Sequence, residues 1–412
     1  MRNPISWSLD QVAPPRLGKD FRWLLSSSLV NNTGDGIVVA AGPLLVASQT
    51  HDAFLVSLAL TFDYLPQLVF GLIGGVAADR FNRRLMVVIA NVSRALVLAF
   101  LTFTIVTGSV SIALVLGAIL LLGTSEVFAD SASSTLLPNI VQRADLGIGN
   151  SRMQGAFVLM NQLVGPPIGA FLFAVGMFIP FATNGIAFVL GAVLISRISK
   201  SVGDVVSTRS GERRSFLADL VDGLRWLIAH PPMRTLALTI LTFNVTFGAA
   251  WGVLVLYASQ RLGMDAVGFG LLTTATAAGG VIAIVLYGPL ERRFSLGNIF
   301  RVGLLIETFT HLTLALTTSP VIALGVLVVF GAHAFIWGTI SNTIRQRATP
   351  NELLGRVGGV MRVASFGGLV VGTPIGGLIA SQFGITAPFW FGFAGSAILV
   401  ALLWRQFGNV AH

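Results

Sequence analysis

The sequence predicts an all-α membrane protein in which twelve membrane-spanning helices form two six-helix halves. Three observations support this fold class: charged residues are few, basic residues concentrate in alternate loops, and motifs recur about half a chain apart. Of the 412 residues, 54% are hydrophobic and 10% are charged, against about 25% charged residues in a typical soluble domain. Apolar stretches such as 101–122 reach the roughly 20 residues that a helix needs to cross the bilayer core.

The apolar stretches define the expected spans in order. The first half should contain 21–49, 54–77, 85–107, 112–136, 150–176 and 180–198, and the second half 234–258, 266–288, 297–318, 320–344, 357–383 and 386–406. The long hydrophilic interval at 199–233 lies between these sets. We therefore expect residues 1–198 and 234–412 to fold as two bundles joined by a linker.

The linker is expected to contain an amphipathic helix. Its apolar residues recur at helical spacing, and two prolines end the pattern: Phe216, Leu217, Leu220, Leu224, Leu227, Pro231 and Pro232. Such a helix could lie on the cytoplasmic membrane surface or pack on the protein, and the sequence favours neither alternative.

The distribution of basic residues predicts how the chain is oriented. With the loops numbered alternately, the basic residues fall on one side, and the opposite loops hold only Arg261. The positive-inside rule then places both termini in the cytoplasm, in a bacterial-type inner membrane. Topology and anionic lipid account for the net charge of +9, so nucleic acid is not expected as a partner. Residues 1–20 are charged and lack the apolar region of a signal peptide.

Three motifs recur at nearly one offset. Ala47-Ser48-Gln49 returns as Ala258-Ser259-Gln260, Val164-Gly165-Pro166-Pro167-Ile168-Gly169 as Val371-Gly372-Thr373-Pro374-Ile375-Gly376, and Asp79-Arg80 as Glu291-Arg292. The offsets are 211, 207 and 212 residues. A parallel repeat of two six-helix bundles is typical of secondary transporters, in which the halves move around a central cavity.

Several motifs indicate a family. Gly75, Asp79, Arg80, Arg83 and Arg84 match the cytoplasmic signature of the major facilitator superfamily, which the chain resembles over essentially its whole length. The run from Gly165 to Gly169 resembles the antiporter signature of its drug exporters. Three further motifs resemble the branch with macrolide efflux proteins and enterobactin exporters: Gly34-Asp35-Gly36, Leu137-Pro138 and Leu354-Gly355-Arg356-Val357. The resemblance implies that spans one, four, seven and ten line the cavity.

The signature loop is a candidate cytoplasmic gate. Asp79 could pair with an arginine and accept hydrogen bonds from a helix N-terminus, while Gly75 lets a neighbouring helix approach. Glu291 and Arg292 offer the counterpart in the second half. Alternatively, Arg80, Arg83 and Arg84 only fix the topology.

Acidic residues within the spans are candidates for proton coupling, because burying one costs roughly 2.5–3.5 kcal/mol on membrane-insertion scales. Asp35, Glu126 and Asp130 face the transport path by the resemblance, and Gly34 and Gly36 would leave room beside Asp35. The alternative is hydrogen bonding between helices, which applies equally to Asp63.

Other ionisable residues in the spans are expected to pair. Arg94 and Asp130 should lie at similar depth, so we expect them to form a structural ion pair. Glu307 and His311 lie one turn apart and could satisfy one another, and His333 is expected to be a packed histidine.

The glycine–proline motifs should bend spans five and eleven symmetrically and so serve as gates. They comprise Gly165, Pro166, Pro167 and Gly169, with Gly372, Pro374 and Gly376 in the second half. The alternative role is close packing by small residues. Asn31, Asn32, Trp251 and Trp337 are expected to line the substrate cavity.

The sequence contains no phosphate-binding loop, no cysteine and no convincing metal-ligand cluster, so we expect no cofactor and no enzymatic activity. The predicted function is proton-coupled export of hydrophobic or amphipathic small molecules by a monomer in the lipid bilayer. The alternatives are an exporter of one metabolite such as a siderophore, a lipid flippase, and a membrane partner that transports nothing.

Overall fold

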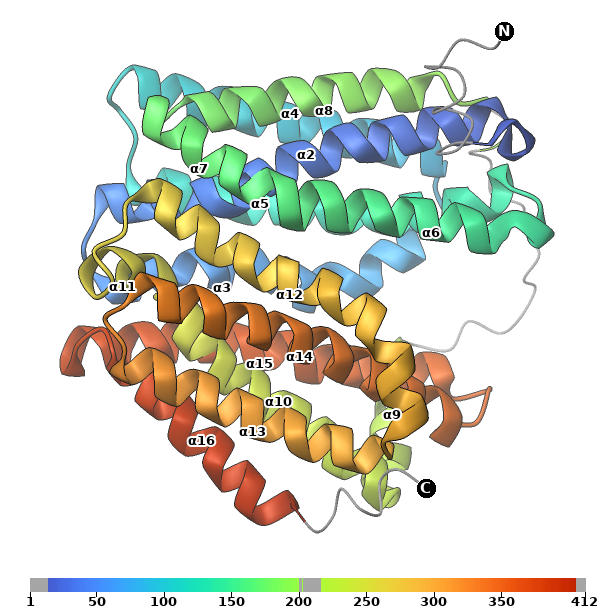
Figure 1. Cartoon of the computed structure of the whole chain (residues 1–412). Coiled ribbons are helices and arrows are strands. Elements are labelled where there is room, and N and C mark those ends of the chain that lie inside the picture. The colour runs from blue at the N-terminus through green and yellow to red at the C-terminus, as the bar shows by residue number, and fades with distance from the viewer. Residues whose placement is uncertain (1–13, 200–201, 203–215, 405–412) are drawn as a thin grey trace, which may run out of the picture. The chain divides into compact units, whose positions relative to one another are not determined.

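The computed structural model describes residues 14–199, 202 and 216–404 (Figure 1). These residues form helices and connecting loops, with no strand among them. Eleven helical segments are long and apolar enough to cross a membrane, and the apolar helix α16 (Ala387–Leu403) is slightly shorter. They correspond to the twelve predicted spans, so the predicted fold class is confirmed.

The helices follow one another along the chain with short connections. The first part contains η1 (Pro15–Leu17), α2 (Gly18–Gln49), α3 (Ala53–Ala78), α4 (Arg83–Val106), α5 (Ile112–Ile140), η2 (Arg143–Asp145), α6 (Leu146–Ala156), η3 (Phe157–Val164), α7 (Gly165–Val175) and α8 (Ile179–Ser196). The second part contains α9 (Phe216–Ala229), α10 (Pro231–Trp251), α11 (Leu254–Gln260), α12 (Ala266–Arg293), α13 (Leu296–Leu316), α14 (Pro320–Ala348), α15 (Leu354–Phe383) and α16.

The chain divides into two compact units. The first unit comprises Met1–Leu45 and Val69–Arg209, and the second comprises Val46–Leu68 and Ser210–His412. The predicted halves, 1–198 and 234–412, differ from these units because the start of α3 belongs with the second unit. There the hydroxyl groups of Thr61 on α3 and Thr373 on α15 lie 2.6 Å apart.

Glycine on α15 permits this close approach. A Cβ atom at Gly377 would lie 2.7 Å from the Cα atom of Phe54, well inside an ordinary contact distance. The first residues of α3 can therefore pack directly on α15, which explains why the contacts divide the chain within α3 as well as in the linker.

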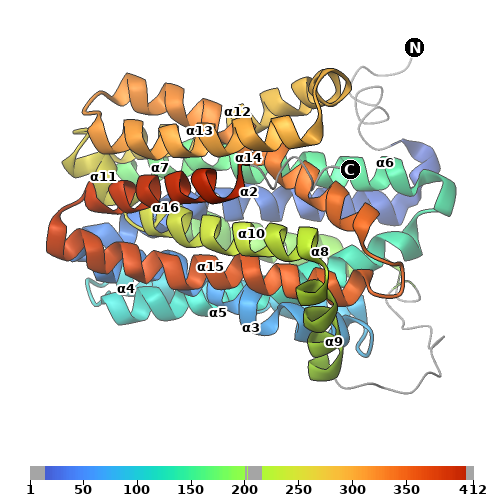
Figure 2. The same ribbon diagram turned by 90° about the horizontal axis from the view of Figure 1, so that it is seen from below.

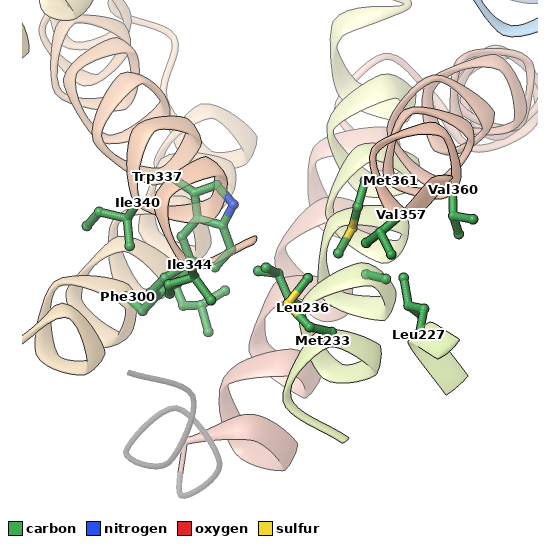
Figure 3. Packing of buried hydrophobic residues seen from close by; sticks show 12 residues of the cluster. Leu227, Met233, Leu236, Phe300, Trp337, Ile340, Ile344, Val357, Val360 and Met361 are labelled. Carbon is green, nitrogen blue, oxygen red and sulfur yellow. The ribbon is translucent and has the colours of Figure 1, made fainter. Parts of the chain in front are cut away.

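A large apolar core organises the second unit (Figure 3). It joins α9, α10, α13, α14 and α15 through Leu227, Met233, Leu236, Phe300, Trp337, Ile340, Ile344, Val357, Val360 and Met361. Burial of such side chains contributes roughly 1.5–3 kcal/mol each relative to exposure in water, although helix association inside a bilayer depends more on close packing.

The fifth span is interrupted where the sequence places its two prolines. Pro166 and Pro167 have no backbone N–H, and the preceding segment η3 is a π-helix. The Gly165 amide there donates to the carbonyl of Met160, five residues earlier. The equivalent span α15 continues as one helix through Pro374. Span eleven therefore has no π-helical segment like that of span five, and the symmetric bends remain a prediction.

The two glycine motifs nevertheless share a packing role. A Cβ atom at Gly169 would overlap the carbonyl oxygen of Ile37 on α2, and one at Gly376 would overlap that of Ala249 on α10. Ala249 follows Ile37 by 212 residues and Gly376 follows Gly169 by 207, which are the offsets of the sequence repeat. Close packing by small residues, the alternative role for these motifs, is thus present in both units.

The linker helix α9 packs on the protein, against α10 and α15 (Figure 2). Arg356 at the start of α15 forms ion pairs with Asp219 at 2.9 Å and Asp222 at 3.5 Å. A Cβ atom at Gly223 would lie 2.7 Å from the Arg356 carbonyl oxygen, so the helix lies close to α15. A helix is therefore present where the amphipathic helix was predicted, and its Leu220, Trp226 and Leu227 side chains pack in the apolar core of the second unit.

Candidate functional site

The first unit contains a cavity of about 110 Å³ among its membrane-spanning helices. Its polar lining comes from α2, α4 and α5: Ser27, Ser28, Asn31, Asn32, Asp35, Arg94, Glu126, Asp130 and Ser133. All of these except the three serines were predicted site residues. Glu126 and Asp130 lie one turn apart on α5, as their spacing indicates.

Arg94 forms an ion pair with Asp35. The Arg94 Nη1 and Asp35 Oδ2 atoms lie 3.4 Å apart, with side-chain exposures of 4% and 22%. The arginine head also lies 4.3 Å from the centre of the Phe188 ring, a cation–π contact. The expected Arg94–Asp130 pair remains a prediction, because Asp130 lines the same cavity and lies close enough to Arg94 for an electrostatic interaction.

The two glycines that flank Asp35 allow close packing of α2. A Cβ atom at Gly34 would overlap the Asn184 side chain of α8, and one at Gly36 would lie 2.6 Å from backbone oxygens of η3. The two glycines therefore bring α2 against α8 and η3. The open space beside Asp35 is the cavity described above, and neither glycine lines it.

Two asparagines that lie beside these residues were not predicted from the sequence. Asn91 and Asn184 are almost fully buried, and Asn31 donates a hydrogen bond of 3.3 Å to Asn91. Among the described residues, one polar atom of each of these side chains has no hydrogen-bond partner: Asn31 Oδ1, Asn91 Nδ2, Asn184 Oδ1 and Arg94 Nε. Asparagines inside predicted spans three and six were the available signal. The set forms a polar region inside an otherwise apolar bundle.

The predicted aromatic residues of the second unit have different surroundings. The Trp251 ring centre lies 4.3 Å from that of Phe247 and 4.7 Å from that of Phe330. Trp251 and Phe247 are half-buried, so they present part of an aromatic surface. Trp337 is 7% exposed and packs edge-on against Phe300 at 4.3 Å. Its place in the apolar core does not support the expected role in a substrate cavity.

The arginines of the signature loop bind helix ends. Arg83 donates to the carbonyl oxygens of Ala78 at 3.1 Å and Thr135 at 3.3 Å, close to the ends of α3 and α5. Arg84 donates to the carbonyl oxygens of Ile195, at 3.3 Å, and Ser196 at the end of α8. Carbonyls at helix C-termini lack intrahelical partners and carry partial negative charge. The loop arginines therefore have a structural role in the first unit.

The other predicted gate residues are accessible. Asp79 is 70% exposed and lies 3.9 Å from Arg83, and Arg80 is exposed. In the second unit, Glu291 is half-buried and Arg292 is exposed at the end of α12. Their part in a gate remains a prediction.

Arg261, the exception to the charge distribution, has a similar contact. It donates at 3.1 Å to the carbonyl oxygens of Leu316 and Thr317, which end α13. A need to stabilise this helix end explains a basic residue on the side with few positive charges.

Comparison with known proteins shows what this architecture is similar to. Residues 11–409 match a family described as transmembrane secretion effector. The multidrug efflux pump Tap of Mycolicibacterium fortuitum is 29% identical over 380 residues, covering 89% of this chain and 90% of Tap. The enterobactin exporter EntS of Shigella boydii serotype 4 (strain Sb227) is 25% identical over 415 residues, covering 97% of this chain and 95% of EntS.

Solved transporter structures have the same fold. A bacterial homologue of the iron transporter ferroportin superposes with a TM-score of 0.75 at 16% identity, covering 95% of this chain and 98% of that one. A bacterial homologue of the lysosomal transporter Spinster gives 0.71 at 13% identity, with 97% and 98% covered. The chain therefore belongs to the transmembrane secretion effector family of the major facilitator superfamily, whose members are multi-pass membrane transporters.

Proposed function

We propose that this protein exports hydrophobic or amphipathic small molecules, including drugs, across a bacterial inner membrane in exchange for protons. The relatives named as a multidrug pump and a siderophore exporter support export as the direction of transport. The arrangement of charge inside the first unit supports protons as the coupling ion.

The observation that carries the proposal is the ion pair between Arg94 and Asp35 beside two further carboxylates. Charged groups within a membrane-spanning bundle are costly and usually mark ion or substrate pathways. Protonation of Asp35 would neutralise its charge and weaken its attraction to Arg94. Glu126 and Asp130 line the same cavity, so Arg94 would have alternative partners there.

The cavity size supports a coupling role rather than binding of a whole drug. A drug-sized ligand needs a pocket of roughly 300–1,000 Å³, and this cavity measures about 110 Å³. It can hold protons and a few water molecules. The half-buried rings of Phe247 and Trp251 in the second unit are the kind of surface on which flat apolar groups stack.

Transport into proteoliposomes with an imposed pH gradient tests the proposal. The wild type should concentrate ethidium against its gradient, and Asp35→Asn should abolish this uphill transport while downhill exchange continues. Glu352→Gln, which changes an exposed loop carboxylate, is the matched control and should transport normally. If Asp35→Asn still concentrates ethidium while Glu126→Gln does not, the two carboxylates have exchanged roles. If wild-type transport ignores the pH gradient, proton coupling is wrong.

Export of a single siderophore is the second candidate, favoured by the 25% identity to EntS over 95% of that protein. A panel of unrelated apolar cations and one catecholate siderophore separates the two. Transport of several cations supports drug export, and transport of the siderophore alone supports the dedicated exporter.

We also infer that both termini lie in the cytoplasm, because the basic loops should face that side. We propose separately that the chain functions as a monomer. On this orientation Asp79 and its neighbouring arginines lie at the cytoplasmic ends of the helices, where a gate would act.

A further inference from the structure

A cluster of three ionisable side chains lies inside the second unit. Glu307 and His311 are one turn apart on α13, and His333 comes from α14. The His311 Nδ1 atom is 3.4 Å from one Glu307 carboxylate oxygen, and the His333 Nε2 atom is 3.8 Å from the other. Relative exposures are 0%, 0% and 5%, so the cluster is sealed within the protein.

The polar atoms of this cluster are poorly satisfied. Both carboxylate oxygens of Glu307 and the Nε2 atom of His333 have no hydrogen-bond partner among the described residues. The His311 Nδ1 atom lies 3.1 Å from the Glu307 backbone oxygen. An ionised carboxylate without a compensating charge is unfavourable in such a place. One proton shared among the three groups would leave the cluster with no net charge.

Close packing holds the cluster together. A Cβ atom at Gly303 would lie 2.8 Å from the His333 ring, and one at Gly392 of α16 would overlap the His311 ring. Glycine at these two positions makes room for the imidazoles, so the neighbouring helices are adapted to them.

On the helices that pack around Glu307, the described residues place no other charged group close to its carboxylate. Along α13, α10 and α14 the other ionisable side chains are Arg301, Arg234, Arg345 and Arg347; α16 has none. Arg301 is six residues from Glu307, about 9 Å along the helix, and its side chain binds the Trp404 carbonyl. On α14, Arg345 and Arg347 are at least twelve residues from His333, about 18 Å along the helix. Arg234 of α10 donates a hydrogen bond to the Ile228 carbonyl.

The remaining neighbours do not alter this conclusion. The Tyr257 hydroxyl of α11 donates to the Leu314 carbonyl. Tyr287 and Glu291 of α12, which packs on α14, share a hydrogen bond near the end of their helix with Arg292 and Arg293. The described residues contain no group suited to hold a metal ion.

We propose that Glu307, His311 and His333 form a second proton-binding site, which holds one exchangeable proton inside the second unit. The cluster is too enclosed to bind a drug, so the ligand that we propose for it is a proton. His333 is its most exposed member, and its ring centre lies 6.2 Å from that of Phe330 and 6.4 Å from that of Phe243. On this proposal, movement of the Phe243 and Phe330 rings would let the proton exchange between His333 and water.

A role for this proton in transport rests on the proposed proton coupling, whereas its binding does not. The direct test therefore uses histidine NMR of the full-length protein in lipid nanodiscs. The chain has five histidines, so ¹⁵N-histidine labelling gives few signals, and His311→Gln and His333→Gln assign two of them. Ring-nitrogen shifts are followed between pH 4 and pH 10.

The expected result is a common titration step for His311 and His333 that Glu307→Gln displaces by about one pH unit or more. Asp35→Asn, in the first unit, is the matched control and should leave that step unchanged. Two independent titrations that ignore Glu307→Gln would overturn the proposal, and so would signals that never change over this range. Glu307→Asp repeats the test if Glu307→Gln does not fold.

Transport measurements then distinguish the proposed proton coupling from the proposed proton-binding cluster. Glu307→Gln should reduce the number of protons exchanged per ethidium in proteoliposomes. If wild-type transport is independent of pH but the histidines titrate together and depend on Glu307, the proton site stands and the coupling mechanism fails. If transport is coupled but the histidines do not titrate, only the second site is wrong.

Discussion

Adding one methyl group at Gly169 should destabilise the protein, because α7 meets α2 at that point. A Cβ atom there would overlap the Ile37 carbonyl oxygen and lie 2.7 Å from the carbonyl carbon, against 3.4–4 Å for an ordinary contact. Overpacking of this kind typically costs about 1–3 kcal/mol. Alanine also favours the helix over glycine by up to about 1 kcal/mol, which offsets part of the cost.

Gly117→Ala on α5 is the matched control, because a Cβ atom there would meet nothing within 4 Å. This variant gains the helix propensity without the overlap, so it should be about 1–3 kcal/mol more stable than Gly169→Ala. Gly376→Ala and Gly338→Ala form the same pair in the second unit. Unfolding of the four variants in mixed micelles with increasing SDS measures the differences.

Equal stability of Gly169→Ala and Gly117→Ala would show that α2 and α7 do not approach this closely in the folded protein. A loss confined to Gly169→Ala, with Gly376→Ala unaffected, would instead show that the two repeats pack differently.

The remaining predictions concern the signature loop and the orientation. Arg84→Gln should lower the free energy of unfolding by about 1–3 kcal/mol, because two carbonyls at the end of α8 lose a charged donor, whereas exposed Arg80→Gln should not. Asp79→Asn should reduce ethidium flux at unchanged expression, and a wild-type rate would exclude a gating role. Since the chain has no native cysteine, Ser109→Cys should react with an impermeant maleimide on intact cells, and Glu352→Cys only after permeabilisation; the reverse pattern would invert the topology.

Sequence reasoning was most successful where the signal lies within one segment. Apolar length and charge located the spans, and proline located the interruption before α7. The helical spacing in the linker also predicted α9. Each of these features depends on neighbours a few residues apart, so no knowledge of tertiary packing was needed.

The failures all concern which helices touch. Depth along a helix predicted that Arg94 and Asp130 lie at one level, and both line the cavity, but it could not show that Asp35 of another helix lies 3.4 Å from Arg94. The spacing of Glu307 and His311 was visible, whereas the approach of His333 from another helix was not. Trp337 was assigned to a cavity from its residue type, although packing against Phe300 places it in the core.

The hydrogen bond between Thr61 and Thr373 joins residues 312 positions apart, and this has a consequence for synthesis. Ribosomes add roughly 5–20 residues per second, so Thr373 is made about 15–60 s after Thr61. During that time the start of α3 lies in the membrane before α15, its final neighbour, has been synthesised. Ser57 and Thr61 direct their hydroxyls to carbonyls of their own helix, at 2.7 and 3.3 Å, so neither is left unsatisfied. The nascent helix can therefore keep these hydroxyls hydrogen-bonded in lipid until α15 is synthesised.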